Sequence, residues 1–103
     1  MTLNAIIEIF RQYLIKHFGD RFLGDNEAKE LRAHRFVLMS PDAADASQRT
    51  RLILPYDVCE DLESYPQVLT DLAKSDALAD KLRVQDVTVT LQGPAAIRSL
   101  RLT

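Results

Sequence analysis

Cysteine, histidine, glycine and tryptophan are scarce in this sequence. Its 103 residues include one cysteine, two histidines, three glycines and no tryptophan. The single thiol, Cys59, cannot form an internal disulfide, which favours a reducing compartment and a cytoplasmic location. No uncharged apolar run approaches the roughly 18 residues that a membrane span requires. The N-terminus also lacks the basic region and cleavage site of a signal peptide, so we expect a soluble chain with no membrane contact.

Length and composition predict a single α+β domain spanning residues 1–103. Hydrophobic residues make up 47% of the chain and charged residues 27%, which suits one core but not two. The net charge is −2, but it is unevenly distributed. Residues 55–80 contain seven carboxylates and one lysine, whereas no acid follows Asp86. Charge blocks of this size are usually solvated faces, so they indicate two sides of opposite sign and no particular ligand.

Residues 3–18 are predicted to form a helix, with Thr2 as N-cap and Gly19 at the C-terminal end. One face repeats apolar positions at intervals of three and four: Leu3, Ile6, Ile7, Phe10, Leu14, His17 and Phe18. Ile9, Tyr13 and Ile15 lie outside this stripe, so apolar surface extends far round the helix. Either the rest of the domain covers that surface or a second chain does.

The next stretch, residues 19–31, is predicted to be a loop with a short helical turn near 27–31. Two Gly-Asp pairs in it flank the apolar pair Phe22 and Leu23. The β-branched and aromatic content of residues 33–40 predicts a strand, and 41–48 is turn-like.

A second strand is expected over residues 49–55, ended by Pro55. Together the two strands predict a hairpin with a long, mobile tip. Alternation along the second strand separates a face expected to be buried from one expected to be at least half exposed. The first carries Thr50, Leu52 and Leu54, and the second carries Arg49, Arg51 and Ile53.

The acidic segment is predicted to form two or three short helices. Asp57 and Ser64 stand three residues before Glu60 and Gln67, as capping residues do, and Ser75 or Asp76 is a candidate start for a third helix. Pro66 is placed early enough in its helix to be tolerated. The predicted core-facing residues are Leu62, Val68, Leu69, Leu72, Leu78 and Leu82.

Residues 87–91 alternate strictly and predict a strand, which is followed by a turn at 92–94. Residues 97–102 fit neither period, which leaves a short bulged strand and a frayed helix both open. The order is therefore about α-β-β-α-α-β-β, and we expect a long N-terminal helix and short acidic helices packed on a small antiparallel sheet.

No motif in the sequence indicates catalysis or a cofactor. His17 lies on the apolar helix face, His34 leads into a strand and has no Cys, Ser-Gly or acidic motif near it in sequence, and the acids around Cys59 should raise the pKa of its thiol. These residues make no zinc spacing, and the acidic segment lacks the pattern of a calcium loop. The three glycines form no phosphate-binding loop. We therefore expect a protein that is not an enzyme and binds no metal or cofactor.

A protein-interaction role is the favoured hypothesis, as an adaptor or assembly component that self-associates as a homodimer. The predicted contact residues are apolar: Ile9, Tyr13, Ile15, Phe22 and Leu23. Charged accessories are expected at Arg49, Arg51, Arg98 and Arg101. The alternative is a nucleic-acid-binding accessory protein that uses arginines on its strands, although net negative charge and the lack of stacking aromatics weigh against it.

Overall fold

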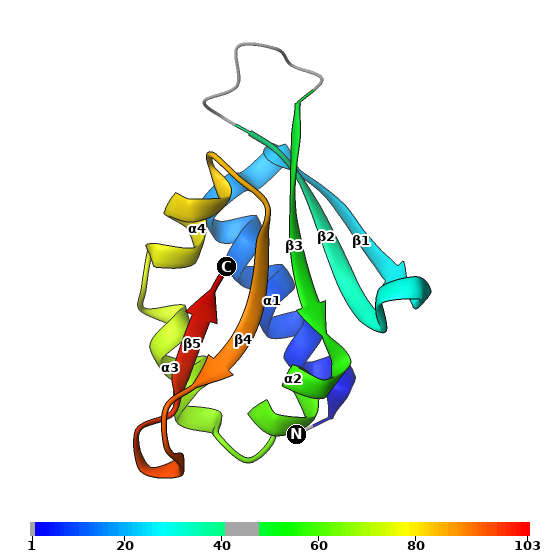
Figure 1. Cartoon of the computed structure of the whole chain (residues 1–103). Coiled ribbons are helices and arrows are strands. Elements are labelled where there is room, and N and C mark those ends of the chain that lie inside the picture. The colour runs from blue at the N-terminus through cyan, green and yellow to red at the C-terminus, as the bar shows by residue number, and fades with distance from the viewer. Residues whose placement is uncertain (1, 41–47) are drawn as a thin grey trace.

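Along the described part of the chain, one α-helix is followed by three strands, then by three α-helices and then by two strands (Figure 1). The structure, a computed structural model, describes residues 2–40 and 48–103. The helices are α1 (Leu3–Phe18), α2 (Tyr56–Leu62), α3 (Pro66–Ala73) and α4 (Ala77–Leu82). The strands are β1 (Phe22–Ala28), β2 (Ala33–Met39), β3 (Arg49–Pro55), β4 (Val87–Gln92) and β5 (Ser99–Leu102). The predicted α+β class is confirmed.

One five-stranded sheet contains all these strands, in the order β1-β2-β3-β4-β5. Neighbouring strands are antiparallel except for β3 and β4, which run parallel. The prediction of an antiparallel sheet is therefore wrong at this one pair. Three helices connect β3 to β4 and bring the chain back to the end of the sheet where β3 began, which is the connection that a parallel pair requires.

The helices lie on one side of the sheet and leave the other side uncovered in the part of the chain that the structure describes (Figure 1). α1 packs against α2 and α4 and across the strands. The core lies in this layer, where Ile6, Phe10 and Leu14 of α1 are fully buried. The same core contains inward residues of the three central strands: Phe36, Leu38, Leu52, Leu54, Val87 and Val89.

The predicted first helix and its caps are confirmed. Thr2 Oγ1 accepts a hydrogen bond of 3.2 Å from the Ala5 N–H, and Gly19 ends the helix with φ of 55°. Tyr13 is buried, and its hydroxyl is hydrogen-bonded in the interior: it donates to the Ser75 carbonyl at 2.7 Å and accepts from the Ala79 N–H at 3.2 Å. Ile9 is partly buried against the core. The domain itself therefore covers two of the three apolar residues outside the main stripe.

Strand β1 was not predicted, and the expectation of a loop over residues 19–31 is wrong between Phe22 and Ala28. Its sequence, FLGDNEA, has poor strand propensity and no regular alternation. The register with β2 contains a bulge between Phe22 and Gly24 and forms because β2 offers an unpaired edge. The predicted helical turn at 27–31 is confirmed only in part, as a single 3-10 turn over Lys29–Leu31.

The hairpin of β2 and β3 is confirmed, as are the faces of β3. Thr50, Leu52 and Leu54 are buried, whereas Arg51 is exposed and Ile53 is half-buried. The predicted turn at 41–48, and with it the tip of the hairpin, lies outside the described residues apart from Gln48.

Three helices form in the acidic segment, where two or three were predicted, and the expected leucines and Val68 are buried. The predicted side-chain caps are wrong at Asp57 and Ser64, because α2 begins at Tyr56 and α3 is preceded by Tyr65, neither start having a side-chain cap. Ser75 Oγ does accept a hydrogen bond of 3.2 Å from the Ala77 N–H at the start of α4. The C-terminal alternatives resolve as a strand, because β5 pairs with β4 from Ser99 to Leu102.

Candidate functional site

The face of the sheet that the helices leave uncovered carries apolar and basic side chains outside the core. Strand alternation directs Val37, Met39 and Ile53 to this side, and all three are half-buried. Arginines alternate with them across the hairpin, because Ile53 is opposite Arg35, Val37 is opposite Arg51, and Met39 is opposite Arg49. We call the outward-facing positions of the five strands the outer face.

The outer face is basic. It carries Arg35, Arg49 and Arg51 on the hairpin and Arg101 on β5, opposite Thr90. None of the outward positions of the described strands holds a carboxylate, since Asp25 and Glu27 of β1 are on the same face as Phe36 and His34. Two acids of the described residues stand at the border of the outer face. Glu30 lies 3.9 Å from Arg35, and Asp86 accepts a hydrogen bond of 2.9 Å from the Arg51 N–H.

The structure does not bring the five predicted contact residues together on one surface. Tyr13 is internal and Ile9 is partly so. Ile15 is 41% exposed, but it lies on α1, on the helical side of the sheet. Phe22 packs on the core with its ring centroid 6.4 Å from that of Phe36. Leu23 is 45% exposed and lines a shallow hollow with Val37, so it alone borders the outer face.

The four predicted charged accessories are divided between two places. Arg49, Arg51 and Arg101 belong to the outer face. Arg98 lies beside α3, where its guanidinium sits 5.5 Å from the centroid of the Tyr65 ring. Arg35, which the nucleic-acid alternative counts among the arginines in or beside the strands, joins the first three on the outer face, where it lies opposite Ile53.

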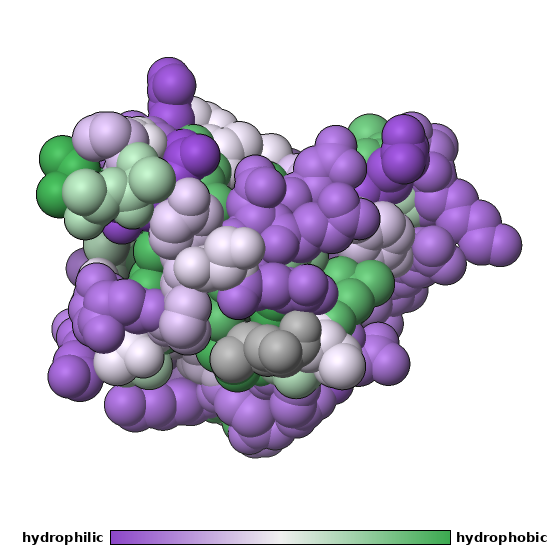
Figure 2. All heavy atoms as spheres, turned by 90° about the horizontal axis from the view of Figure 1, so that it is seen from below, coloured by the Kyte–Doolittle hydropathy of each residue, from purple (hydrophilic) through white to green (hydrophobic). Residues whose placement is uncertain are grey.

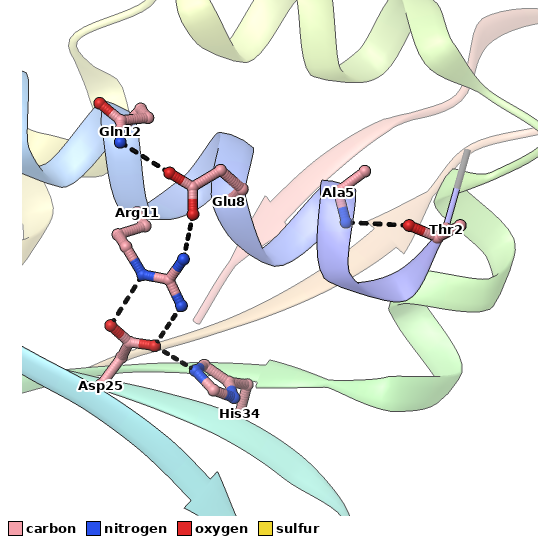
Figure 3. Close-up of polar contacts among 7 residues, drawn as sticks. All are labelled: Thr2, Ala5, Glu8, Arg11, Gln12, Asp25 and His34. Atoms are coloured by element: carbon pink, nitrogen blue, oxygen red, sulfur yellow. Dashed lines mark hydrogen bonds and ion pairs between the residues drawn. The ribbon is translucent and has the colours of Figure 1, made fainter.

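A second cluster of charged side chains ties α1 to the edge of the sheet (Figure 3). Arg11 donates to both oxygens of Asp25, with distances of 2.9 Å from Nε to Oδ1 and 2.7 Å from Nη2 to Oδ2. His34 Nε2 lies 2.6 Å from Asp25 Oδ2, and Glu8 pairs with Arg11 on the helix surface. Because β1 was not predicted, nothing in the sequence pattern indicated that Asp25 lies beside His34.

The electrostatics of this cluster follow from the central carboxylate. The Arg11 guanidinium, assisted by His34, holds the pKa of Asp25 below its usual value despite the opposing effect of burial. Hydrogen bonds and charge from Asp25 raise the pKa of Arg11 in turn. Among the described residues, no hydroxyl, thiol or amine is placed in a hydrogen bond with the His34 ring, so the cluster resembles an acid–base pair without a nucleophile. Its arrangement fits a structural brace.

The lone thiol is unsuited to chemistry. Cys59 is fully buried, and burial, together with Glu63 and Glu60, raises the pKa of its thiol to about 12. His17 contacts other groups: its ring centroid lies 4.3 Å from that of Tyr13 at an interplanar angle of 41°, and its Nε2 lies 3.9 Å from Asp76 Oδ1. Within residues 2–40 and 48–103 no group of three potential metal ligands gathers, and no helix is long and apolar enough to cross a membrane.

Cys59 supplies the first testable prediction. At pH 8 the native chain is expected to react with a chromogenic disulfide reagent at least a hundredfold more slowly than the unfolded chain, because only local or global opening exposes the thiolate. The rate is measured by absorbance, once in native buffer and once in about 6 M guanidinium, which unfolds the chain fully. An immediate stoichiometric reaction of the native chain contradicts the buried placement.

Comparisons of the chain with protein-family models, curated proteins and solved structures gave no match.

Proposed function

We propose that the protein is a non-enzymatic interaction module whose outer face binds an acidic surface of a partner protein. The observation that carries this proposal is the alternation of half-buried apolar side chains with arginines on a sheet face whose described strand positions hold no carboxylate. Arginine and methionine are enriched at protein interfaces, where apolar contacts form the centre and charges the rim. Val37, Met39 and Ile53 are the central residues in this arrangement.

Charge favours a different protein over a second copy. A two-fold dimer through the outer face would place the arginines of one copy against those of the other, and like charges across an interface are costly. The acidic helices of a second copy would offer the opposite charge, but that contact is head-to-tail and does not close on itself. The homodimer expected from the sequence is thus the alternative outcome. Light scattering at low and high salt separates a monomer from it.

Charge reversal tests the proposal. The wild-type chain is immobilised to capture binding proteins from an extract of its own cells, and the affinity of each captured protein is then measured by calorimetry. Arg51→Glu combined with Ile53→Asp is expected to weaken binding at least a hundredfold, since it removes one guanidinium, adds two carboxylates and disrupts the apolar centre.

Arg21→Glu is the matched control. Arg21 is an exposed arginine in the 3-10 turn Gly19–Arg21 between α1 and β1, and it occupies none of the outward strand positions, so its charge reversal should leave the affinity unchanged. A thermal melt of each variant confirms folding. A partner that binds the Arg51→Glu/Ile53→Asp chain as tightly as the wild type contradicts the proposal.

Nucleic-acid binding is the second candidate, because the same four arginines could contact phosphates. The outward positions of the described strands carry no aromatic residue on which bases would stack. Labelled single-stranded RNA and duplex DNA are therefore expected to bind weakly, with affinity falling steeply as salt rises. Submicromolar affinity that persists at about 150 mM salt and is lost in Arg51→Glu would instead favour this candidate.

A further inference from the structure

A groove runs between α3 and the C-terminal strand, on the opposite side of β5 from its partner β4. Its first part is a hollow of about 190 Å³ lined by Leu72, Leu78, Leu100 and Leu102. Its second part, of about 360 Å³, is lined by Tyr65, Pro66 and the alanines of the β4–β5 connection. Val68 and Arg98 line both parts, which joins them into one feature. We call it the α3–β5 groove.

Strand β5 forms one wall of this groove, and some of its backbone N–H and C=O groups point away from β4. β5 is an edge strand, and among the described strands it pairs with β4 alone. Thr103 exchanges both backbone hydrogen bonds with Thr88, and in an antiparallel ladder the residues of β5 alternate, so the N–H and C=O of Leu100 and Leu102 are directed away from β4. The Leu102 carbonyl accepts a hydrogen bond of 2.6 Å from Lys81 Nζ. The N–H and C=O of Leu100 are therefore the groups through which a further strand would pair.

Arg98 presents an unused donor in the same groove. Its Nη1 donates to the Gly93 carbonyl at 3.0 Å, and the guanidinium lies over the Tyr65 ring. Its Nε is buried and has no hydrogen-bond partner in the described part of the chain. A buried donor without a partner carries a desolvation cost that an incoming acceptor would remove. A carboxylate is the acceptor that a guanidinium binds most strongly.

We propose that the α3–β5 groove binds an extended peptide segment of a partner protein, which adds to the sheet as a strand beside β5. Its backbone pairs with Leu100 and the Leu102 N–H, one apolar side chain fills the 190 Å³ hollow, and a carboxylate approaches Arg98. Residues 98–102 span about 16 Å in extended conformation, which matches a peptide of about five residues. This site lies at the sheet edge and does not depend on the outer face.

The charges beside the groove favour an acidic peptide over a second copy of β5. Arg98 lines the groove and Lys81 reaches the Leu102 carbonyl beside it, whereas Asp71 is the one carboxylate among the described residues that line the groove. If two β5 strands paired through Leu100 and Leu102, the two-fold axis would pass at Arg101 and place the two guanidinium groups opposite each other. Lys81 and Arg101 therefore oppose self-pairing at this edge, as charged residues on edge strands do.

A random library of linear peptides displayed on phage tests the proposal, with the wild-type chain as bait. The expected result is a consensus in which an apolar residue and an acidic residue are two positions apart, as side chains on one side of a strand are. A selected peptide is then synthesised with a fluorescent label, and its affinity is measured by polarisation. Arg98→Met should weaken it about tenfold or more, whereas Arg51→Glu on the outer face should leave it unchanged.

A modified peptide makes the test independent of how the variants fold. N-methylation of the peptide residue opposite Leu100 removes one hydrogen bond and should reduce affinity at least tenfold, whereas N-methylation of the next residue should not. In NMR spectra of the wild-type chain, the Leu100 amide should shift and its hydrogen exchange should slow. Failure to select any peptide, or selection of peptides that shift outer-face amides and leave Leu100 unchanged, would overturn the proposal.

Discussion

Replacement of Phe36 by alanine is expected to lower the free energy of unfolding by about 3–5 kcal/mol. Phe36 lies on the inward face of β2, is fully buried, and packs near His34 at 5.1 Å and Phe22 at 6.4 Å between ring centroids. Its loss leaves a cavity under α1 that neighbouring side chains fill only in part. A domain of this size has a total stability of about 5–15 kcal/mol, so the variant loses much of it. Urea denaturation monitored by circular dichroism measures the change.

Val37→Ala is the matched control, one residue further along the same strand. Val37 faces the opposite way and is half-buried on the outer face, so its truncation should cost less than about 1 kcal/mol. The contrast between the two variants tests which face of the sheet is the core and which is available to a partner. Equal losses would mean that another element covers the outer face, which would remove the basis of the proposed function.

Asp25→Asn is expected to destabilise the chain by about 1–3 kcal/mol. The substitution keeps the shape of the side chain, but it removes the charge that Arg11 and His34 share and leaves one of the two Arg11 donors without an acceptor. The Asp25 side chain is 12% exposed, so solvent replaces these interactions only in part. Asp20→Asn, at an exposed carboxylate in the turn after α1, is the control and should change stability little. Loss of comparable size at both positions would show that the brace contributes nothing specific.

The same carboxylate predicts how stability depends on pH. The pKa of Asp25 is lower in the folded chain than its usual value of 3.8, so the unfolded chain binds the proton more readily. This contribution to stability is complete above about pH 5 and is lost as pH falls through the folded pKa. Asp25→Asn should therefore lose less stability than the wild type between about pH 5 and pH 2. Parallel pH profiles for the two chains contradict the assigned interaction.

The exposed hydrophobic residues of the described chain are scattered, and they mark no further surface of their own. Seen from the end that carries the β4–β5 connection, the molecule is mostly hydrophilic, with separate hydrophobic patches (Figure 2). Leu31, Val84 and Ile97 are more than half exposed but lie in three different connections. Such isolated residues are normal on protein surfaces. The outer face and the α3–β5 groove differ because each combines apolar side chains with directed polar groups.

Several parts of the fold could be predicted because their local pattern and their tertiary role agree. The spacing of Ile6, Phe10 and Leu14 sets the buried stripe of α1, and the alternation of Leu52 and Leu54 sets the inward face of β3. In both cases these apolar side chains must be buried for the element to be stable, so their spacing in the sequence indicates which face of the element is buried. The short helices after Pro55 were predictable for the same reason.

Strand β1 could not be predicted, because its stability comes from a neighbour and not from its own residues. Gly24, Asp25 and Asn26 disfavour an isolated strand, but backbone pairing with β2 and the contact of Asp25 with Arg11 stabilise it in the folded chain. The candidate sites share this origin. Arg35 joins Arg51 only through the register of the hairpin, and Arg98 meets α3 only because β5 returns beside it.

The sequence by itself determined the α+β class, the extent of α1, the two faces of β3 and the burial of the leucines in the acidic helices. It determined them because hydrophobic periodicity is a local property that each element needs before it can pack. Only the tertiary structure decided that Tyr13 is internal, that β3 and β4 are parallel, and that one sheet face is left to the arginines. These outcomes depend on how distant segments pair and which surfaces they cover, and that information lies in contacts between elements.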